Sequence, residues 1–169
     1  ILNDFLSLGK LEEGKVELTM QSLNLDELLK EIRDELKNSL REGQYIEIQI
    51  QDNLTDIMTD SKILRNILFN LLSNASKYSD NHKSIQLTVE KNQNDLLLHV
   101  KDEGIGIPKD DQRHLFDRFF RAGNVSNIQG TGLGLHIVKR YVDLLGGVIS
   151  FESLQNKGTT FSVSIPQHS

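Results

Sequence analysis

Residues 60–78 read DSKILRNILFNLLSNASKY, and the organisation of the chain can be worked out from this stretch. Apolar side chains recur in it at helical spacing, and asparagines recur every four residues on a separate stripe. The apolar set is Ile63, Leu64, Ile67, Leu68, Leu71, Leu72 and Ala75, and the polar stripe is Asn66, Asn70 and Asn74 with Lys77 beside them. The pattern predicts one long helix from Asp60 to about Tyr78, with a broad buried face and a narrow polar stripe.

The asparagine stripe admits two interpretations. Asparagine is a mediocre helix former, so a face that merely meets water would favour Lys, Glu or Gln. A carboxamide oxygen can ligate a hard cation such as Mg²⁺, which takes few protein ligands and completes its octahedron with phosphates and water. We favour a functional stripe over a solvated helix face.

Outward from this helix, strands and further helices are expected on both sides. Strands are predicted at 16–20, 45–50, 56–59, 85–89, 96–100, 148–154 and 159–165. Helices are predicted from the chain start to near Gly9, from an Asn24 cap to Gly43, after Pro108, and from Gly132 to Leu145. Because the strands come mostly as hairpin-like pairs, the order predicts an α+β sandwich with a mixed, mostly antiparallel sheet covered by helices on one face.

Composition excludes several classes of protein. The 169 residues correspond to about one domain, and the absence of cysteine excludes disulfide scaffolds, thiolate metal sites and cysteine nucleophiles. Nineteen Lys and Arg and 24 Asp and Glu give a net charge of −5, which offers no bulk attraction to nucleic acid or to an acidic membrane surface. A local basic patch stays open as an alternative, and we expect no nucleic-acid partner. No apolar run approaches the ~20 residues that span a bilayer, so we expect a soluble domain from a reducing compartment.

Two glycine-rich segments carry further candidate residues. Asp102-x-Gly104-x-Gly106 follows a predicted strand, where glycine lets a ligand approach the main chain and Asp102 can accept a hydrogen bond from an amine such as adenine N6. Taken alone, that segment is better interpreted as an ordinary turn. The second segment, residues 130–135 (GTGLGL), opens a helix whose free N–H groups and dipole suit phosphate. It does not have the spacing of the dinucleotide fingerprint.

The aromatic segment between them, residues 116–121 (FDRFFR), adds two arginines. Guanidinium suits the charge that develops on phosphate during transfer, but for Arg118 or Arg121 alone ordinary surface charge is an equal alternative. We interpret the phenylalanines as anchors for a mobile loop at 122–130, which shows no hydrophobic period.

In combination and in this order, these segments resemble the N, G1, F and G2 boxes of the catalytic ATP-binding domain of bacterial sensor histidine kinases. This domain belongs to a superfamily that also includes gyrase, the heat-shock-90 chaperones and the mismatch-repair ATPases. The matching segments are 70–79, 102–108, 116–121 and 130–135, and the terminal residues 158–166 also fit. The resemblance covers residues 17–169 and implies a Bergerat-type sandwich that binds Mg·ATP under a flexible lid at about 121–131. Residues 1–16 resemble the C-terminal end of the preceding dimerisation helix, so we expect an excised fragment.

The resemblance also implies a role for each matched residue. Asp102 would hold adenine N6, and Tyr78 would line the base or ribose. Mg²⁺ would be held by Asn74 with Asn70, and the phosphates would be reached by Lys77 and Arg121, so the expected catalytic residues are Asn70, Lys77 and Arg121. The other expected nucleotide-binding positions are Gly104, Gly106, Ile107, Thr131, Gly132, Leu133, Gly134 and Leu135.

Asn70 separates the enzyme classes within this superfamily. Hydrolysing relatives carry Glu at that position, whereas Asn cannot accept a proton at neutral pH. The implied reaction is transfer of the ATP γ-phosphoryl group to a histidine supplied by another domain. His82, His99, His114, His136 and His168 all lack the acidic residue that follows the family's acceptor histidine, so the acceptor is expected upstream of residue 1.

The expected partners follow from the resemblance as well. They are an upstream dimerisation domain that carries the acceptor histidine and the receiver domain of a response regulator. We expect a monomeric fragment from a homodimeric parent, a cytoplasmic location, and a parent that is an inner-membrane sensor. The alternatives on the same fold are a nucleotide-binding regulatory module without transferase activity, a serine-directed kinase and an ATP-driven chaperone.

Overall fold

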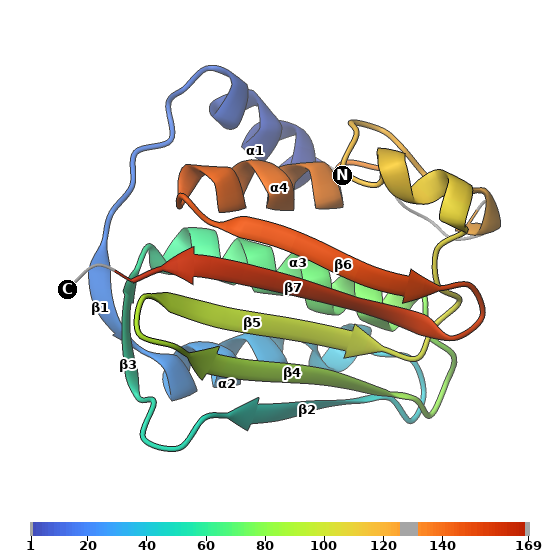
Figure 1. The fold of residues 1–169 in the computed structure, drawn as a ribbon, viewed down its shortest axis with the longest axis horizontal. Helices are drawn as coiled ribbons and strands as arrows, with labels where there is room; N and C mark the ends of the chain where they lie inside the picture. The colour runs from blue at the N-terminus through green and yellow to red at the C-terminus, as the bar shows by residue number, and fades with distance from the viewer. Residues whose placement is uncertain (1, 126–131, 168–169) are drawn as a thin grey trace.

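A sheet and a layer of helices form the two layers of the structure (Figure 1). The structure is a computed structural model that describes residues 2–125 and 132–167. In chain order its helices and strands are α1 (Leu2–Glu12), β1 (Gln21–Asn24), α2 (Leu25–Leu36), β2 (Tyr45–Ile50), β3 (Asp56–Thr59), α3 (Ser61–Lys77), β4 (Ser84–Lys91), β5 (Asp95–Asp102), α4 (Gly134–Leu144), β6 (Val148–Leu154) and β7 (Gly158–Pro166). Single 3₁₀ segments cover Lys37–Ser39, Lys109–His114 and Gly123–Val125.

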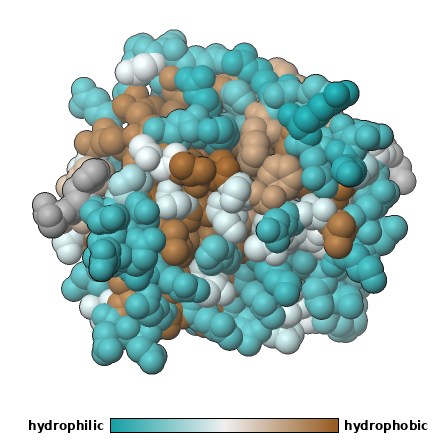
Figure 2. All heavy atoms as spheres, viewed as in Figure 1, coloured by the Kyte–Doolittle hydropathy of each residue, from teal (hydrophilic) through white to brown (hydrophobic). Residues whose placement is uncertain are grey.

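The main sheet has five strands in the order β2-β4-β5-β7-β6. Only β2 and β4 run parallel, and the other three pairs are antiparallel, so the predicted α+β sandwich with a mixed, mostly antiparallel sheet is confirmed. Alternate residues of the central strands are buried under the helices, as in Leu98 and Val163. The opposite face is open to solvent, and Figure 2 shows hydrophobic residues near its centre among hydrophilic ones. Val148 and Leu154 of β6 are exposed on the edge strand.

Helix α3 lies against the middle of the sheet and agrees with the predicted helix. Asp60 caps its N-terminus, because its Oδ1 accepts from the N–H groups of Lys62 and Ile63 at 3.0 and 3.1 Å while its Oδ2 accepts from Thr19 N at 2.8 Å. Tyr78 ends the helix. All seven predicted apolar positions of α3 are buried. The helix therefore turns its polar stripe away from the core.

Three expectations for the N-terminal third are wrong. Helix α1 continues through Gly9 to Glu12, because a glycine inside a helix costs only about 1 kcal/mol and the flanking Leu8 and Leu11 are buried. Residues 16–20 form no strand, because Leu18 and Met20 are both about 40% exposed and give the segment no buried face. The first strand of the chain is β1, which follows this segment and pairs with β3.

The third error concerns the helix that follows Asn24. Asn24 caps α2 as predicted, with Oδ1 accepting from Glu27 N at 3.0 Å. The helix ends at Leu36 instead of Gly43, and one 3₁₀ turn follows it. Ser39 Oγ donates to the Leu36 carbonyl oxygen at 2.9 Å, a local side-chain contact that competes with helix continuation.

Two boundaries near the C-terminal half also shift. The segment after Pro108 is a 3₁₀ helix. Helix α4 begins at Gly134, because Gly132 has a φ of +75° and cannot belong to a right-handed helix. Within residues 2–125 and 132–167, no helix is both long and apolar enough to cross a bilayer.

Helix α1 packs on α4 and on the aromatic segment. Its Leu8 and Leu11 are buried, Glu12 forms an ion pair with Arg118, and the ring of Phe5 lies 6.3 Å from that of Phe119. The assignment of residues 1–16 to a separate dimerisation helix stays a prediction.

Candidate functional site

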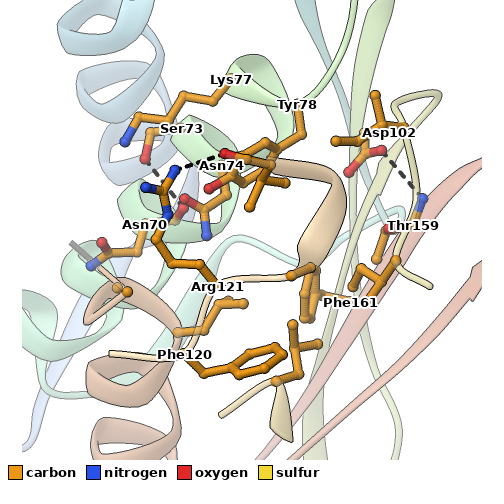
Figure 3. Close-up of a pocket in the computed structure, with 18 of the residues that line it drawn as sticks. Asn70, Ser73, Asn74, Lys77, Tyr78, Asp102, Phe120, Arg121, Thr159 and Phe161 are labelled. Atoms are coloured by element: carbon orange, nitrogen blue, oxygen red, sulfur yellow. Dashed lines mark hydrogen bonds between the residues drawn. The ribbon is translucent and has the colours of Figure 1, made fainter. Parts of the chain in front are cut away.

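A cavity of about 640 Å³ opens between α3, the start of α4 and the ends of β5 and β7. Its volume lies within the usual range for small-molecule sites. Most of the predicted site residues line it, and Figure 3 shows several of them pointing into the same space. The predicted residues on its wall are Asn70, Asn74, Lys77, Tyr78, Asp102, Gly106, Ile107, Arg121, Gly132, Gly134 and Leu135.

Three predicted positions do not lie on that wall. Gly104 and Leu133 are not among the lining residues, and Leu133 is fully buried. Thr131 lies outside the described residues, as does the part of the expected lid after Val125.

The carboxylate of Asp102 is the only ionisable side chain buried at the cavity end formed by β5 and β7, among the residues that the structure describes. Its Oδ1 accepts from Gly104 N at 2.9 Å and from Thr159 N at 3.2 Å. The side chain is only 8% exposed, and this burial raises its pKa to about 6 although the two N–H groups act in the opposite direction. Oδ2 has no hydrogen-bond partner within the described part of the chain, so Asp102 can accept a bond from a ligand donor.

The two glycines after Asp102 lie close to neighbouring backbone. A Cβ on Gly106, whose φ is +68°, would lie 2.1 Å from the Leu154 carbonyl oxygen. A Cβ on Gly104 would lie 2.3 Å from the Tyr78 carbonyl oxygen, next to the bond in which Ile105 N donates to that same oxygen at 3.0 Å. These glycines therefore let the segment pack against neighbouring backbone.

The asparagine stripe lies along the opposite wall. Asn70 Nδ2 donates to Asn66 Oδ1 at 2.6 Å and to the Asn66 carbonyl oxygen at 2.9 Å. Asn70 Oδ1 has no hydrogen-bond partner in the part of the chain that the structure describes, and it faces the start of α4, where a Cβ on Gly134 would lie 3.4 Å from it. The carboxamide of Asn74 has no hydrogen-bond partner among residues 2–125 and 132–167. Asn66, to which no role was given from the sequence, thus orients Asn70.

The cationic side chains differ in their surroundings. Arg121 Nη2 donates to the Val125 carbonyl oxygen at 2.9 Å, and its charge lies near Tyr78. Burial raises the pKa of Tyr78, and the charge of Arg121 partly offsets this rise. Lys77 is exposed at the rim. Arg118 pairs with Glu12 away from the cavity, which supports surface charge as its role.

The aromatic segment is anchored mainly by its first ring. Phe116 packs edge-on against Phe151 and Phe161, with centroids 5.8 and 6.5 Å apart. Phe119 is 53% exposed, and Phe120 lines the cavity. The expectation that the phenylalanines act as anchors therefore holds for Phe116.

Sequence reasoning missed nine residues of the wall: Asp4, Ser73, Ile105, Leu115, Phe120, Ala122, Val125, Thr159 and Phe161. Thr159 is the most informative, because it pairs with Asp102 across β5 and β7 and its N–H group binds the carboxylate. The motif 158–161 was recognised as fitting the family, but only the strand register brings it to Asp102.

The profile of the family described as histidine kinase-, DNA gyrase B- and HSP90-like ATPases matches residues 59–169. The circadian input-output histidine kinase CikA of Synechococcus elongatus is 35% identical over 172 residues, which cover 99% of this chain and 23% of CikA. The sensor histidine kinase WalK of Bacillus subtilis is 33% identical over 172 residues, covering 98% of this chain and 28% of WalK. The solved structure of full-length ShkA in complex with AMPPNP superposes with a TM-score of 0.86 at 25% identity, covering 99% of this chain and 35% of ShkA.

This chain therefore spans about a quarter of the length of these two curated relatives. The match to the family profile includes all of α3, the segment after β5, the start of α4 and the final strand pair, which together build the cavity. The chain belongs to the histidine kinase-, DNA gyrase B- and HSP90-like ATPase family.

Proposed function

We propose that this chain is the ATP-binding catalytic module of a two-component sensor histidine kinase, which transfers the γ-phosphoryl group of ATP to a histidine on a separate dimerisation domain. The observation that carries the proposal is a cavity with a hydrogen-bond acceptor, Asp102, at one end and neutral carboxamides beside a helix N-terminus at the other. The relatives CikA and WalK are named histidine kinases, and ShkA is bound to AMPPNP, an ATP analogue, which is consistent with it.

At the Asp102 end, the chain is suited to adenine. Asp102 Oδ2 would accept from the exocyclic N6 amine, while Gly104 N and Thr159 N hold Oδ1 in place. Tyr78, Ile107 and Phe161 supply apolar surface for a purine ring. A guanine would present an oxygen at the same position, so the acceptor favours adenine.

At the α3 end, the donor set fits a metal ion that arrives with the nucleotide. No cluster of three or more His, Cys, Asp or Glu side chains able to hold a metal exists within the described part of the chain. Asn70 Oδ1 and Asn74 Oδ1 are neutral oxygen ligands of the kind that Mg²⁺ accepts when phosphates supply the rest of its shell. The ion would neutralise phosphate charge.

For the transfer itself, the chain positions the triphosphate and leaves the nucleophile to a partner. The bond between the γ-phosphorus and its bridging oxygen breaks, and the electron pair leaves with ADP. The unprotonated ring nitrogen of the acceptor histidine would form the new bond to phosphorus, and the proton of the other ring nitrogen would pass to solvent. Lys77 and Arg121 would stabilise the charge on the transferring group. Asn70 cannot act as a base for water, which favours transfer over hydrolysis.

The proposal includes partners and location for the longer protein. We infer an upstream homodimerising domain with the acceptor histidine, a response-regulator receiver domain and a cytoplasmic position in a membrane-anchored sensor. WalK is a sensor histidine kinase by name, which supports the arrangement.

Two measurements test the function. Titration calorimetry with Mg·ATP should show binding by this chain. Incubation with the parent's dimerisation domain and γ-labelled ATP should then label that domain in an acid-labile, base-stable form. Binding without labelling would favour the regulatory module that lacks transferase activity, absence of binding would refute both, and steady hydrolysis by the chain alone would favour an ATP-driven chaperone.

A further inference from the structure

Gln44 is a buried polar side chain that the proposed mechanism does not use. It immediately precedes β2, is 8% exposed, and lies outside the residues 59–169 that match the family profile. No feature of the sequence had singled it out.

Every polar atom of its carboxamide is engaged with the end of α3 or with its own loop. Nε2 lies 3.1, 3.2 and 3.0 Å from the carbonyl oxygens of Ser76, Ser79 and Asp80 and donates to them. Oε1 accepts from Ser76 Oγ at 2.6 Å and from Arg41 N at 3.0 Å. Ser76 lies in the last turn of α3, where carbonyl groups lack a partner within the helix, and Ser79 and Asp80 lie in the segment that follows it. The two hydrogens of one amide group from a distant loop are thus shared among three carbonyl oxygens at this junction.

These contacts lie directly behind the cavity wall. Lys77 and Tyr78, which line the cavity, fall between Ser76 and Ser79 in the chain. On the other side, the Tyr78 carbonyl oxygen accepts from Ile105 N at 3.0 Å. The segment that leaves α3 is therefore held from two sides, by Gln44 and by the turn after Asp102.

We propose that Gln44 is a positioning residue for the nucleotide site, because it fixes the path of residues 76–80 and with it the placement of Lys77 and Tyr78. The inference rests on the proposed function. It means that the loop before β2, which lies outside the four sequence motifs, contributes to nucleotide affinity.

The variant Gln44→Glu tests this inference with almost no change in shape. The oxygen that accepts from Ser76 Oγ and Arg41 N is retained, but the amide NH₂ group is replaced by an oxygen that faces three carbonyl oxygens. The carboxyl group regains a donor only when it is protonated, and the crowded oxygens favour that form. The ionisable side chains nearest in the chain, Arg41, Glu42, Asp80 and His82, are all exposed.

We expect the Kd of the variant for Mg·ATP to be about tenfold above that of the wild type near pH 8 and to approach it near pH 6. The ratio of the two Kd values at each pH removes the titration of Asp102, which both proteins share. Asn81→Asp is the matched control, because it adds the same charge at an exposed position next to Asp80. Thermal denaturation at each pH establishes that the proteins compared are folded.

The outcomes separate this inference from the proposed function. Absence of binding by the wild type refutes the proposed function itself. If the wild type binds Mg·ATP, three results overturn the role of Gln44 alone. These are an unchanged Kd in Gln44→Glu, a loss of affinity in Gln44→Glu that does not vary with pH, and an equal loss of affinity in Asn81→Asp. If Gln44→Glu does not fold, Ser76→Ala removes the hydroxyl that orients the carboxamide, and its Kd should rise about threefold; an unchanged Kd overturns the inference.

Discussion

The substitution Asp102→Asn should stabilise the fold at neutral pH and weaken nucleotide binding at the same time. The wild-type carboxylate is buried with no cation in contact within the described residues, and its charge is held only by the N–H groups of Gly104 and Thr159. Asparagine keeps an oxygen for these two donors and removes the buried charge. The substitution therefore removes the free-energy cost of burying the charge and keeps the hydrogen bonds that shape the turn.

The size of the effect follows from the pKa of the carboxyl group. Folding raises it from an ordinary 3.8 to about 6, and each pH unit of difference is worth about 1.4 kcal/mol. Because the folded state favours the protonated form, Asp102 carries no penalty below about pH 4 and a full penalty of about 3 kcal/mol above about pH 6. The free energy of unfolding of Asp102→Asn should exceed that of the wild type by a margin that grows by up to this amount between these pH values.

Urea denaturation of both proteins from about pH 4 to pH 8 measures this margin. In thermal denaturation it corresponds to a difference in Tm of roughly 6–12 °C at neutral pH for a domain of this size. A margin that does not vary with pH, or a variant less stable than the wild type at pH 7, would refute the assignment of a buried, unpaired carboxylate.

Nucleotide binding should change in the opposite direction. The amide nitrogen of the variant would face the adenine N6 amine, so two donors would meet and one would lose its partner. The loss of a hydrogen bond to a charged acceptor corresponds to roughly 10- to 100-fold in Kd, measured by calorimetry with Mg·ATP at pH 7.5. Wild-type affinity should itself fall as the pH drops below about 6, because protonation of Asp102 removes the acceptor.

Three further substitutions test other parts of the structure. Asn74→Ala should weaken ATP binding about tenfold in the presence of Mg²⁺ and leave it unchanged in EDTA, because only the metal contact is removed; equal affinities of both proteins in Mg²⁺ would contradict the ligand assignment. Gly106→Ala should destabilise the protein by about 2 kcal/mol or more in urea denaturation, because its φ is +68° and the new Cβ would lie 2.1 Å from the Leu154 carbonyl oxygen. Gly123→Ala, where the nearest atom lies at 3.7 Å, is the control and should be neutral. Asp60→Ala should cost about 1–2 kcal/mol through the loss of the α3 cap, and a stability equal to that of the wild type would contradict that role.

Periodicity predicted the parts of the fold in which one face is buried. Helix α3 and strands β2, β4 and β5 have unbroken patterns of large apolar residues, and their predicted bounds agree with the structure to within a few residues. The wrong predictions concern segments whose secondary structure depends on contacts with other elements. Gly9 stays helical because Leu8 and Leu11 pack on α4, and residues 16–20 have the alternation of a strand without a sheet to pair with.

The candidate site was predictable where its residues share one element. A spacing of four along α3 places Asn70 and Asn74 on one stripe whatever the rest of the fold does. Thr159 was not assignable in this way, because it reaches Asp102 through a pairing register across 57 residues. Gln44 contacts the end of α3 over 32 to 36 residues and carries no local pattern at all.

The energetics of Asp102 bear on why a carboxylate occupies this position. A turn that needed only an acceptor for Gly104 N and Thr159 N would be served by asparagine without a buried charge. The carboxylate instead costs about 3 kcal/mol of stability at neutral pH and presents Oδ2, with no partner among the described residues, toward a cavity whose far wall carries the asparagine stripe. A loss of stability at a binding residue is expected when the ligand recovers it. Nucleotide should therefore raise the Tm of the wild type more than that of Asp102→Asn, and an equal rise would mean that the charge at Asp102 serves something other than the ligand.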